Sequence, residues 1–139
     1  MNKIPLSVVV ITKNEEKNIG KCLGSARNWA DELLVVDDES GDGTVIEAEK
    51  YADRILRRRM DNEGKHRNWA YAQARNEWVL SLDADEYVTD ELKQEISTAL
   101  SGNKFNAFLI QLSQVCIGRK FAIKDKIFEI LVPIFLVKI

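Results

Sequence analysis

The chain has 139 residues, the length of one ordinary domain, of which 45% are hydrophobic and 30% are charged. This composition excludes a disordered or collagen-like chain and allows a core of ordinary size. The net charge of −2 provides no overall attraction for nucleic acid, so we expect no nucleic-acid partner. The charge is uneven, because residues 102–139 include six basic and two acidic residues.

Two cysteines, Cys22 and Cys116, lie too far apart for a disulfide framework or a zinc pattern. We expect two buried thiols in a reducing compartment. The apolar stretch at the start of the chain is too short for a signal peptide. The apolar run over residues 130–137 contains Pro133, and a bilayer-spanning helix needs about 20 residues. These features predict a cytoplasmic protein.

The first part of the chain alternates strand and helix patterns. Residues 6–11 (LSVVVI) form a β-branched run that is typical of a strand buried on both faces. Apolar residues then recur at helical spacing from Ile19 and end near Trp29. Residues 33–36 (LLVV) predict a second buried strand, and the turn-rich sequence DDESGDGT follows it.

The alternation continues along the chain. We expect Thr44 to cap the next helix with Glu47 as its capping-box partner, and this helix to end near Tyr51. The remaining expected elements are a strand over 54–57, a helix over 65–74, a strand over 78–82, a helix over 89–100 and a strand over 105–112.

Four alternations of strand and helix predict an α/β fold, a mostly parallel sheet with helices on both faces. Ligands of such sheets bind beyond the carboxyl ends of the strands, so the polar residues there are the candidate functional groups. They are Thr12, Asn14 and Glu15 after the first strand, Asp37 and Asp38 after the second, Arg57, Arg58, Arg59, Lys65, His66 and Arg67 after the third, and Asp83 and Asp85 after the fourth.

Asp83 and Asp85 directly follow a buried strand and, in extended backbone, point to one side. Carboxylates at this spacing suit a hard divalent ion, Mn²⁺ or Mg²⁺, held together with substrate phosphates. The alternative is a solvated acidic turn near a helix start, where carboxylates are favoured. We favour the metal site because the other strand ends are polar as well.

The other strand ends also allow two interpretations. Asp37 and Asp38 either form the turn and cap a helix, or accept hydrogen bonds from a base or ribose. Arg67 either lies with Asn68 on a solvated helix face or presents its planar donors to a phosphate or base. The basic run at residues 57–59 fits a solvated edge better than a phosphate clamp.

Several enzyme classes are excluded by missing motifs. His66 is the only histidine and has no serine or cysteine motif beside it, which argues against a hydrolase triad. The sequence has no P-loop. It also lacks the dinucleotide fingerprint, because Ile46 stands where the third glycine after Gly41 and Gly43 is required.

Four stretches together carry a family resemblance: VVVITKNEEKNI, ELLVVDDESGDGT, GKHRNWAYAQARNEWVLSLDADE and LIQL. Over roughly residues 5–110 the chain resembles the nucleotide-sugar half of a glycosyltransferase family 2 enzyme with the GT-A fold, a Rossmann-like architecture. It is most similar to the lipopolysaccharide core biosynthesis branch, which resembles β-1,4-glucosyltransferases acting on a heptose.

The resemblance implies a set of donor nucleotide-binding residues: Thr12, Asn14, Glu15, Asp37, Asp38, Arg67, Asn68 and Asp83. Among them, Asp37 and Asp38 match the pair that contacts uracil and ribose. Arg67 and Asn68 match a helix start beside the base and phosphates. Asp83 and Asp85 match the DxD motif and imply the metal site, with Asp85 as the direct ligand and Asp83 nearer the ribose.

The resemblance also implies a reaction. The donor is a UDP-sugar, with glucose favoured, and Mn²⁺ or Mg²⁺ assists the departure of UDP. The acceptor is a saccharide or lipid-linked saccharide such as lipopolysaccharide core, and transfer inverts the anomeric centre. Such a transferase works in the cytoplasm, at the inner face of the cytoplasmic membrane, where peripheral membrane contact is expected.

The chain departs from the family after residue 110. We therefore divide it into a nucleotide-sugar-binding domain, 1–112, and an atypical apolar and basic tail, 113–139, interpreted as a truncated or altered acceptor region. Inverting transfer needs a general base, and the only acids in that stretch, Asp125 and Glu129, lie in no recognisable base motif. A membrane-surface tail is the alternative. An unpaired fifth strand and this tail would promote self-association.

Three other functions remain. The first is a remnant that binds nucleotide-sugar without transferring it, which the atypical tail favours. The second is a phosphatase of the haloacid dehalogenase type, which requires Thr or Val where Tyr87 stands and places its aspartates on the first strand. The third is a structural interaction domain, against which the polar ends of four strands argue.

Overall fold

A computed structural model describes residues 2–101, 107–113, 120–123 and 134–138, and it describes side chains in the first of these ranges. The elements in chain order are β1 (Ile4–Thr12), α1 (Ile19–Ala26), β2 (Ala30–Asp37), α2 (Thr44–Ala48), β3 (Arg54–Arg57), α3 (Glu63–Ala72), β4 (Trp78–Asp83), α4 (Asp90–Ser101), β5 (Ala107–Ser113), β6 (Lys120–Ile123) and β7 (Ile134–Lys138).

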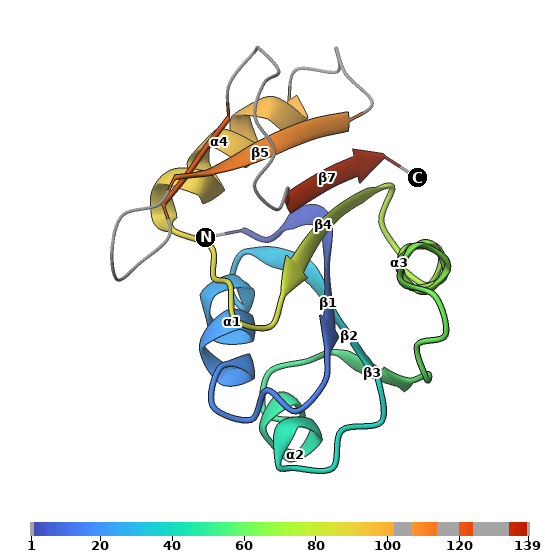
Figure 1. Ribbon diagram of the computed structural model, residues 1–139. Helices are drawn as coiled ribbons and strands as arrows, with labels where there is room; N and C mark the ends of the chain where they lie inside the picture. The colour runs from blue at the N-terminus through green and yellow to red at the C-terminus, as the bar shows by residue number, and fades with distance from the viewer. Residues whose placement is uncertain (1, 102–106, 114–119, 124–133, 139) are drawn as a thin grey trace.

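The strands form one sheet in the order β3-β2-β1-β4-β7-β5-β6. Neighbouring strands from β3 to β4 are parallel, as the alternation of strand and helix predicts. Helices lie on both faces of this part, with α1 and α3 on opposite sides (Figure 1). The predicted α/β fold is therefore confirmed, and it brings the carboxyl ends of four strands to one edge.

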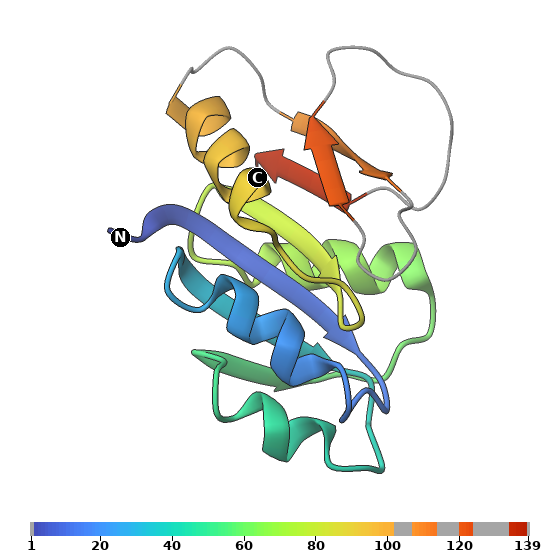
Figure 2. The same ribbon diagram turned by 90° about the vertical axis from the view of Figure 1, so that its left-hand side faces the viewer.

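The continuous apolar runs are explained by two separate cores. On β1, Val8 and Val10 face a core formed with α1, α2 and α4, whereas Val9 faces a second core on the side of α3. Ala70 is the buried contact of α3 in that second core. Figure 2 shows α1 and α2 in front of the sheet and α3 behind it. A strand covered on both faces favours apolar side chains at successive positions, and in residues 6–11 the one polar residue, Ser7, is buried and hydrogen-bonded to Glu32.

The second half of the sheet is antiparallel. β7 pairs with both β4 and β5, and β6 pairs with β5. The expectation of an unpaired fifth strand is therefore wrong, because β5 has a neighbour on each side. Cys22 is buried as expected, whereas Cys116 lies outside the described residues. In the part of the chain that the structure describes, no helix has the length and apolar character needed to cross a bilayer.

Two helix starts differ from the sequence-based expectation. Thr44 is the first residue of α2 and caps nothing, since the cap position is Gly43 and no side chain makes a capping hydrogen bond. The Thr44 backbone N–H instead donates to Asp42 Oδ1 at 3.0 Å. α3 begins two residues earlier than predicted because Asn62 caps it by accepting from the Lys65 N–H.

Candidate functional site

The carboxyl ends of the parallel strands bring the predicted polar residues together. Strand pairing places Asp37 between Thr12 and Arg57, and Asp83 pairs with Ile11 on the other side of β1. The strand ends therefore form one row across β3, β2, β1 and β4, which the alternation predicts.

Two buried oxygens in this row lack hydrogen-bond partners among the described residues: Thr12 Oγ1 and Asp37 Oδ1. Both residues are buried, and they are direct neighbours on β1 and β2. The other Asp37 oxygen, Oδ2, accepts from Ser40 N at 3.0 Å and from Arg57 Nε at 3.4 Å. An unpaired buried polar atom costs about 1–3 kcal/mol. These two atoms are therefore the buried oxygens of the row whose hydrogen bonding is incomplete within the described residues.

Asp38 differs from Asp37 because both of its oxygens are occupied. Oδ1 accepts from Met60 N at 2.8 Å, and Oδ2 accepts from Lys13 Nζ at 3.0 Å. The hydrogen bond from Met60, with a smaller contribution from Lys13, lowers the pKa of the Asp38 carboxyl although burial opposes this. Asp38 thus holds the segment after β3 against the end of β2.

The predicted residues Asn14 and Glu15 tie two loops together. Asn14 N donates to Ser40 Oγ at 2.9 Å, and Asn14 Oδ1 accepts from Gly41 N at 2.8 Å. Glu15 N donates to Thr44 Oγ1 at 2.8 Å. Asn14 has a φ of 53°, in the left-handed region that asparagine tolerates. These contacts fix the loop after β1 against the turn after β2.

Arg67 links α3 to the end of β4. Arg67 Nη2 donates to Asp83 Oδ1 at 3.1 Å, and Arg67 Nε donates to Glu63 Oε1 at 3.1 Å. Burial alone would lower the pKa of Arg67, but the hydrogen bond and charge of Asp83 outweigh it and raise that pKa. Because α3 begins at Glu63, Arg67 and Asn68 lie within the helix and not at its start, which corrects the expectation. Asn68 is exposed, and its side chain makes no hydrogen bond to the described residues.

The two DxD carboxylates have different surroundings. β4 ends at Asp83, and Asp85 lies in the following turn, which the Glu86 N to Asp83 O hydrogen bond of 3.0 Å closes. The extended backbone that was expected to point both carboxylates to one side is therefore absent. Asp85 is exposed and makes no hydrogen bond or ion pair to the described part of the chain. Asp83 keeps one oxygen outside its ion pair with Arg67.

Metal ligation at this turn needs groups from outside the described side chains. Among residues 2–101 no three His, Cys, Asp or Glu side chains gather closely enough to hold a metal ion. Two carboxylates that leave oxygens free nevertheless fit a hard divalent ion whose remaining ligands are phosphates and water. The donor set therefore fits an ion that arrives together with a phosphorylated ligand.

His66, one of the polar residues predicted to follow the third strand, is buried at this edge. Its Nδ1 lies 3.2 Å from Arg58 Nη1, and its Nε2 has no hydrogen-bond partner among the described residues. Burial, assisted by the charge of Arg58, lowers the pKa of His66. The available signal was its spacing, since His66 precedes the inward-facing Ala70 by one helical turn.

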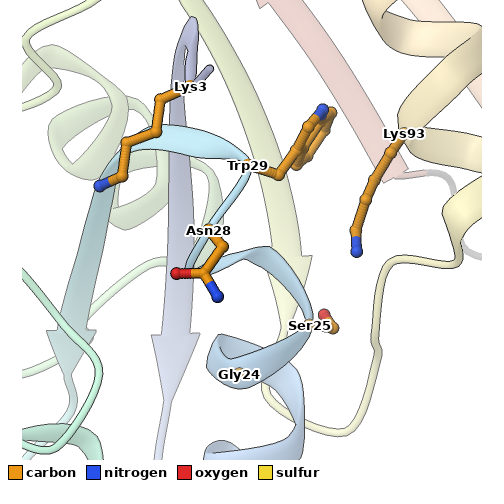
Figure 3. A pocket seen from close by; sticks show the side chains of 6 residues that line it. All are labelled: Lys3, Gly24, Ser25, Asn28, Trp29 and Lys93. Carbon is orange, nitrogen blue, oxygen red and sulfur yellow. The ribbon is translucent and has the colours of Figure 1, made fainter. Parts of the chain in front are cut away.

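A separate pocket of about 450 Å³ lies at the opposite edge of the sheet. Its lining residues are Lys3, Gly24, Ser25, Asn28, Trp29 and Lys93. Figure 3 shows Lys3 extending away from Lys93, so the two ammonium groups do not converge on one ligand position. None of these residues follows the carboxyl end of a strand, and the pocket is not part of the candidate site.

Comparison with known proteins identifies relatives of the chain. An uncharacterized glycosyltransferase of Rickettsia bellii (strain RML369-C) is 32% identical over 123 residues, which cover 88% of this chain and 42% of that protein. The lipopolysaccharide core biosynthesis glycosyltransferase LpsC of Rhizobium meliloti (strain 1021) is 30% identical over 106 residues, covering 73% of this chain and 39% of that protein.

A solved structure supports the same relationship. The crystal structure of S. aureus TarS 1–349 in complex with UDP-GlcNAc matches with a TM-score of 0.70 and 30% identity, covering 82% of this chain and 36% of that one. The chain therefore has the GT-A fold. It spans about two fifths of the length of the curated relatives that it matches. The family model described as Glycosyl transferase family 2 matches residues 7–134. The chain therefore belongs to glycosyl transferase family 2.

Proposed function

We propose that the carboxyl edge of the sheet binds the UDP group of a UDP-sugar, and that the chain supplies the donor half of a metal-dependent, inverting glycosyltransferase. The observation that carries this proposal is the pair of unpaired buried oxygens, Thr12 Oγ1 and Asp37 Oδ1, on neighbouring strand ends. Uracil carries a ring N–H between two carbonyl oxygens, so a carboxylate oxygen accepts from it and a hydroxyl donates to it. The UDP-GlcNAc bound to TarS supports this assignment.

The remaining nucleotide-binding roles follow from position in the same edge. Asp37 and Asp38 serve the uracil and ribose, with Asp38 also holding the loop after β3 through Met60 N. Asn14 and Glu15 keep the first-strand loop in the shape that receives the nucleotide. Arg67, already fixed by Asp83 and positioned with Asn68 on α3, presents guanidinium donors on the phosphate side.

Asp85 and Asp83 would hold the divalent ion, Mn²⁺ or Mg²⁺. Asp85 is the stronger candidate for direct ligation because it is exposed and unpaired among the described residues, whereas Asp83 shares one oxygen with Arg67. When bound, such an ion offsets the negative charge that develops on the departing diphosphate. Arg67 contributes positive charge from the protein itself at the same place.

The proposed reaction is an inverting displacement. The oxygen of an acceptor hydroxyl forms a bond to the anomeric carbon of the sugar, while the bond between that carbon and the β-phosphate oxygen breaks. UDP leaves with the bonding electron pair, and the proton of the hydroxyl passes to a general base. We assign no residue to that base.

Glucose remains our favoured donor sugar, and UDP-GlcNAc is the alternative that the TarS complex suggests. A saccharide acceptor such as lipopolysaccharide core agrees with the printed name of LpsC. The expected location at the cytoplasmic face of the membrane, with peripheral contact, stays a prediction, because the tail that would make this contact lies outside the described side chains.

A second candidate function is nucleotide-sugar binding without transfer by this chain alone. It requires the donor site proposed above and no general base, to which we assign no residue. The two candidates share the donor site and differ only in turnover. Incubation with UDP-glucose, UDP-GlcNAc and saccharide acceptors, followed by measurement of released UDP, separates them.

The donor site is tested by calorimetry with a series of nucleoside diphosphates in the presence of Mn²⁺. We expect UDP to bind at least about tenfold more tightly than CDP, because cytosine has no ring N–H for the Asp37 oxygen and one charged hydrogen bond contributes about 1.5–3 kcal/mol. Equal affinities for UDP and CDP, or the absence of UDP binding by the folded chain, would contradict the proposal.

A further inference from the structure

The loop between β3 and α3 donates two backbone hydrogen bonds to the proposed nucleotide site. Arg58 N donates to Asp37 O at 3.0 Å, and Met60 N donates to Asp38 Oδ1 at 2.8 Å. Both aspartates that we assign to the uridine group are therefore held by backbone donors of this short loop. A side chain that fixes the loop therefore supports the backbone of Asp37 and the carboxylate of Asp38.

Arg58 is the side chain that anchors this loop to α3. Its guanidinium lies 5.1 Å from the centre of the Trp69 ring, and its Nη1 lies 3.2 Å from His66 Nδ1. A third contact, to Asp61 at 3.8 Å, joins Arg58 to an exposed carboxylate of the same loop. His66 is fully buried, so it provides the interior end of this anchor.

A hydrogen bond from Arg58 to His66 Nδ1 is compatible only with a neutral imidazole ring. A guanidinium group has only donors, so Nδ1 must be the acceptor and the neutral ring carries its hydrogen on Nε2. Protonation would remove the acceptor and place a second cation directly against Arg58. Arg67 on α3 adds a further positive charge near the ring, whereas the carboxylates of Asp38 and Asp61 act in the opposite direction.

We propose that neutral His66 is a positioning residue of the nucleotide site, acting through Arg58 and the loop at residues 58–61 to hold Asp37 and Asp38 in their binding geometry. This inference rests on the proposed function, since it assumes that UDP binds at those aspartates. It gives His66 a role without contact to the ligand, which agrees with its complete burial.

The proposal predicts a dependence of UDP affinity on pH. Burial and Arg58 lower the pKa of His66 from its ordinary value of 6.5. The neutral ring is therefore retained at pH 7 and above, and UDP affinity is expected to fall only when the pH decreases well below that ordinary value. The terminal phosphate of UDP also titrates near pH 6, so the contribution of the protein must be separated from that of the ligand.

Two variants make this separation. His66→Gln keeps an acceptor for Arg58 but does not titrate, whereas His66→Phe fills much of the space without an acceptor. UDP affinity is measured by calorimetry from pH 5 to 8 in the full chain, with circular dichroism to verify folding. The ratio of the wild-type to the His66→Gln affinity cancels the titration of UDP.

We expect His66→Gln to bind UDP within about threefold of wild type at pH 7.5 and to lose the protein-linked part of the acid decrease. His66→Phe should bind about tenfold more weakly at pH 7.5. A constant ratio of wild type to His66→Gln across the pH range would overturn the proposal, as would unchanged UDP affinity in folded His66→Phe. If the folded wild type binds no UDP at any pH, the proposed function fails as well, which distinguishes the two failures.

Discussion

Buried carboxylates at the amino ends of the strands differ in hydrogen bonding from those at the carboxyl ends. Toward the amino ends of the strands, Glu32 is 1% exposed and accepts from Ser7 Oγ at 2.6 Å, Arg54 Nη1 at 2.9 Å and Arg75 N at 2.7 Å. At the carboxyl ends, Asp37 is equally buried, yet its Oδ1 has no partner among the described residues. The same chemical group is fully paired in one place and left incomplete in the other.

We interpret this difference as a distinction between residues that stabilise the fold and residues of the proposed donor site. The buried side-chain atoms without partners in the described part of the chain are Thr12 Oγ1, Asp37 Oδ1 and His66 Nε2, and all belong to the carboxyl edge. Buried polar atoms are nearly always paired, so their concentration at one edge indicates a function there. The amino edge tests this interpretation because it has similar groups without the unpaired atoms.

The largest expected effect on stability is at Glu32. Glu32→Ala removes the shared acceptor of Ser7 and Arg54, and we expect the free energy of unfolding to fall by about 3 kcal/mol, the lower end for a broken buried pair because Arg54 is partly exposed. Urea unfolding measures this change. UDP affinity of the folded protein should stay the same in the milder variant Glu32→Gln. Weakened UDP binding in that variant would remove the distinction between the two edges.

Asp37→Asn should weaken UDP binding and have little effect on stability, the reverse of the changes at Glu32. We expect UDP affinity to fall by about ten- to hundredfold, the loss of one charged hydrogen bond, while the free energy of unfolding changes by less than about 1 kcal/mol. The matched control is Asp53→Asn toward the amino edge, where Asp53 accepts from Leu33 N at 2.8 Å and Arg27 Nη1 at 2.7 Å. Asp53→Asn should lower stability and leave UDP binding unchanged. The reverse pattern in the pair would contradict the account.

The smallest effects are expected from removing either of two hydroxyl groups of β1, those of Ser7 and Thr12. Ser7→Ala removes a hydroxyl that donates to Glu32 and accepts from Asn76 N, so unfolding free energy should fall by about 1–2 kcal/mol. Thr12→Val removes an unpaired hydroxyl with little change of shape, so stability should be equal or higher by about 0.5 kcal/mol. UDP affinity should decrease about threefold only in Thr12→Val. Thermal and urea unfolding together with calorimetry test the pair, and a larger stability loss in Thr12→Val would be inconsistent with an unpaired oxygen.

The parallel half of the fold was predictable because its determinants are local. Apolar runs of the length of a strand alternate with helical spacing, and each polar segment directly follows its strand, so the meeting of Thr12, Asp37 and Asp83 at one edge follows from topology alone. The antiparallel half was not predictable in the same way. β7 inserts between β4 and β5, and such non-local pairing leaves no periodic signal in the sequence.

The candidate site was predictable in composition but not in its hydrogen bonds. Sequence placed Asp37 and Asp38 together, whereas only the structure separates the half-paired Asp37 from the fully paired Asp38. The predicted capping box of Thr44 and Glu47 was wrong. The Thr44 N–H donates to Asp42, and the Thr44 hydroxyl accepts from Glu15 N. Long-range contacts decide such competition between partners, and a local pattern does not contain them.

The most direct test of the central claim is calorimetric titration of UDP into the chain with and without Mn²⁺, using Asp85→Ala as the test variant and Asp31→Ala as the control. Asp85 is exposed beside the proposed phosphate position, and Asp31 is an exposed aspartate at the amino edge. We predict that Mn²⁺ increases UDP affinity by at least about tenfold in wild type and Asp31→Ala, and that this increase disappears in Asp85→Ala while the fold is retained. A UDP affinity that changes neither with Mn²⁺ nor with the Asp85→Ala substitution would contradict the assignment of the carboxyl edge as the donor site. The absence of UDP binding by the folded chain would contradict it as well.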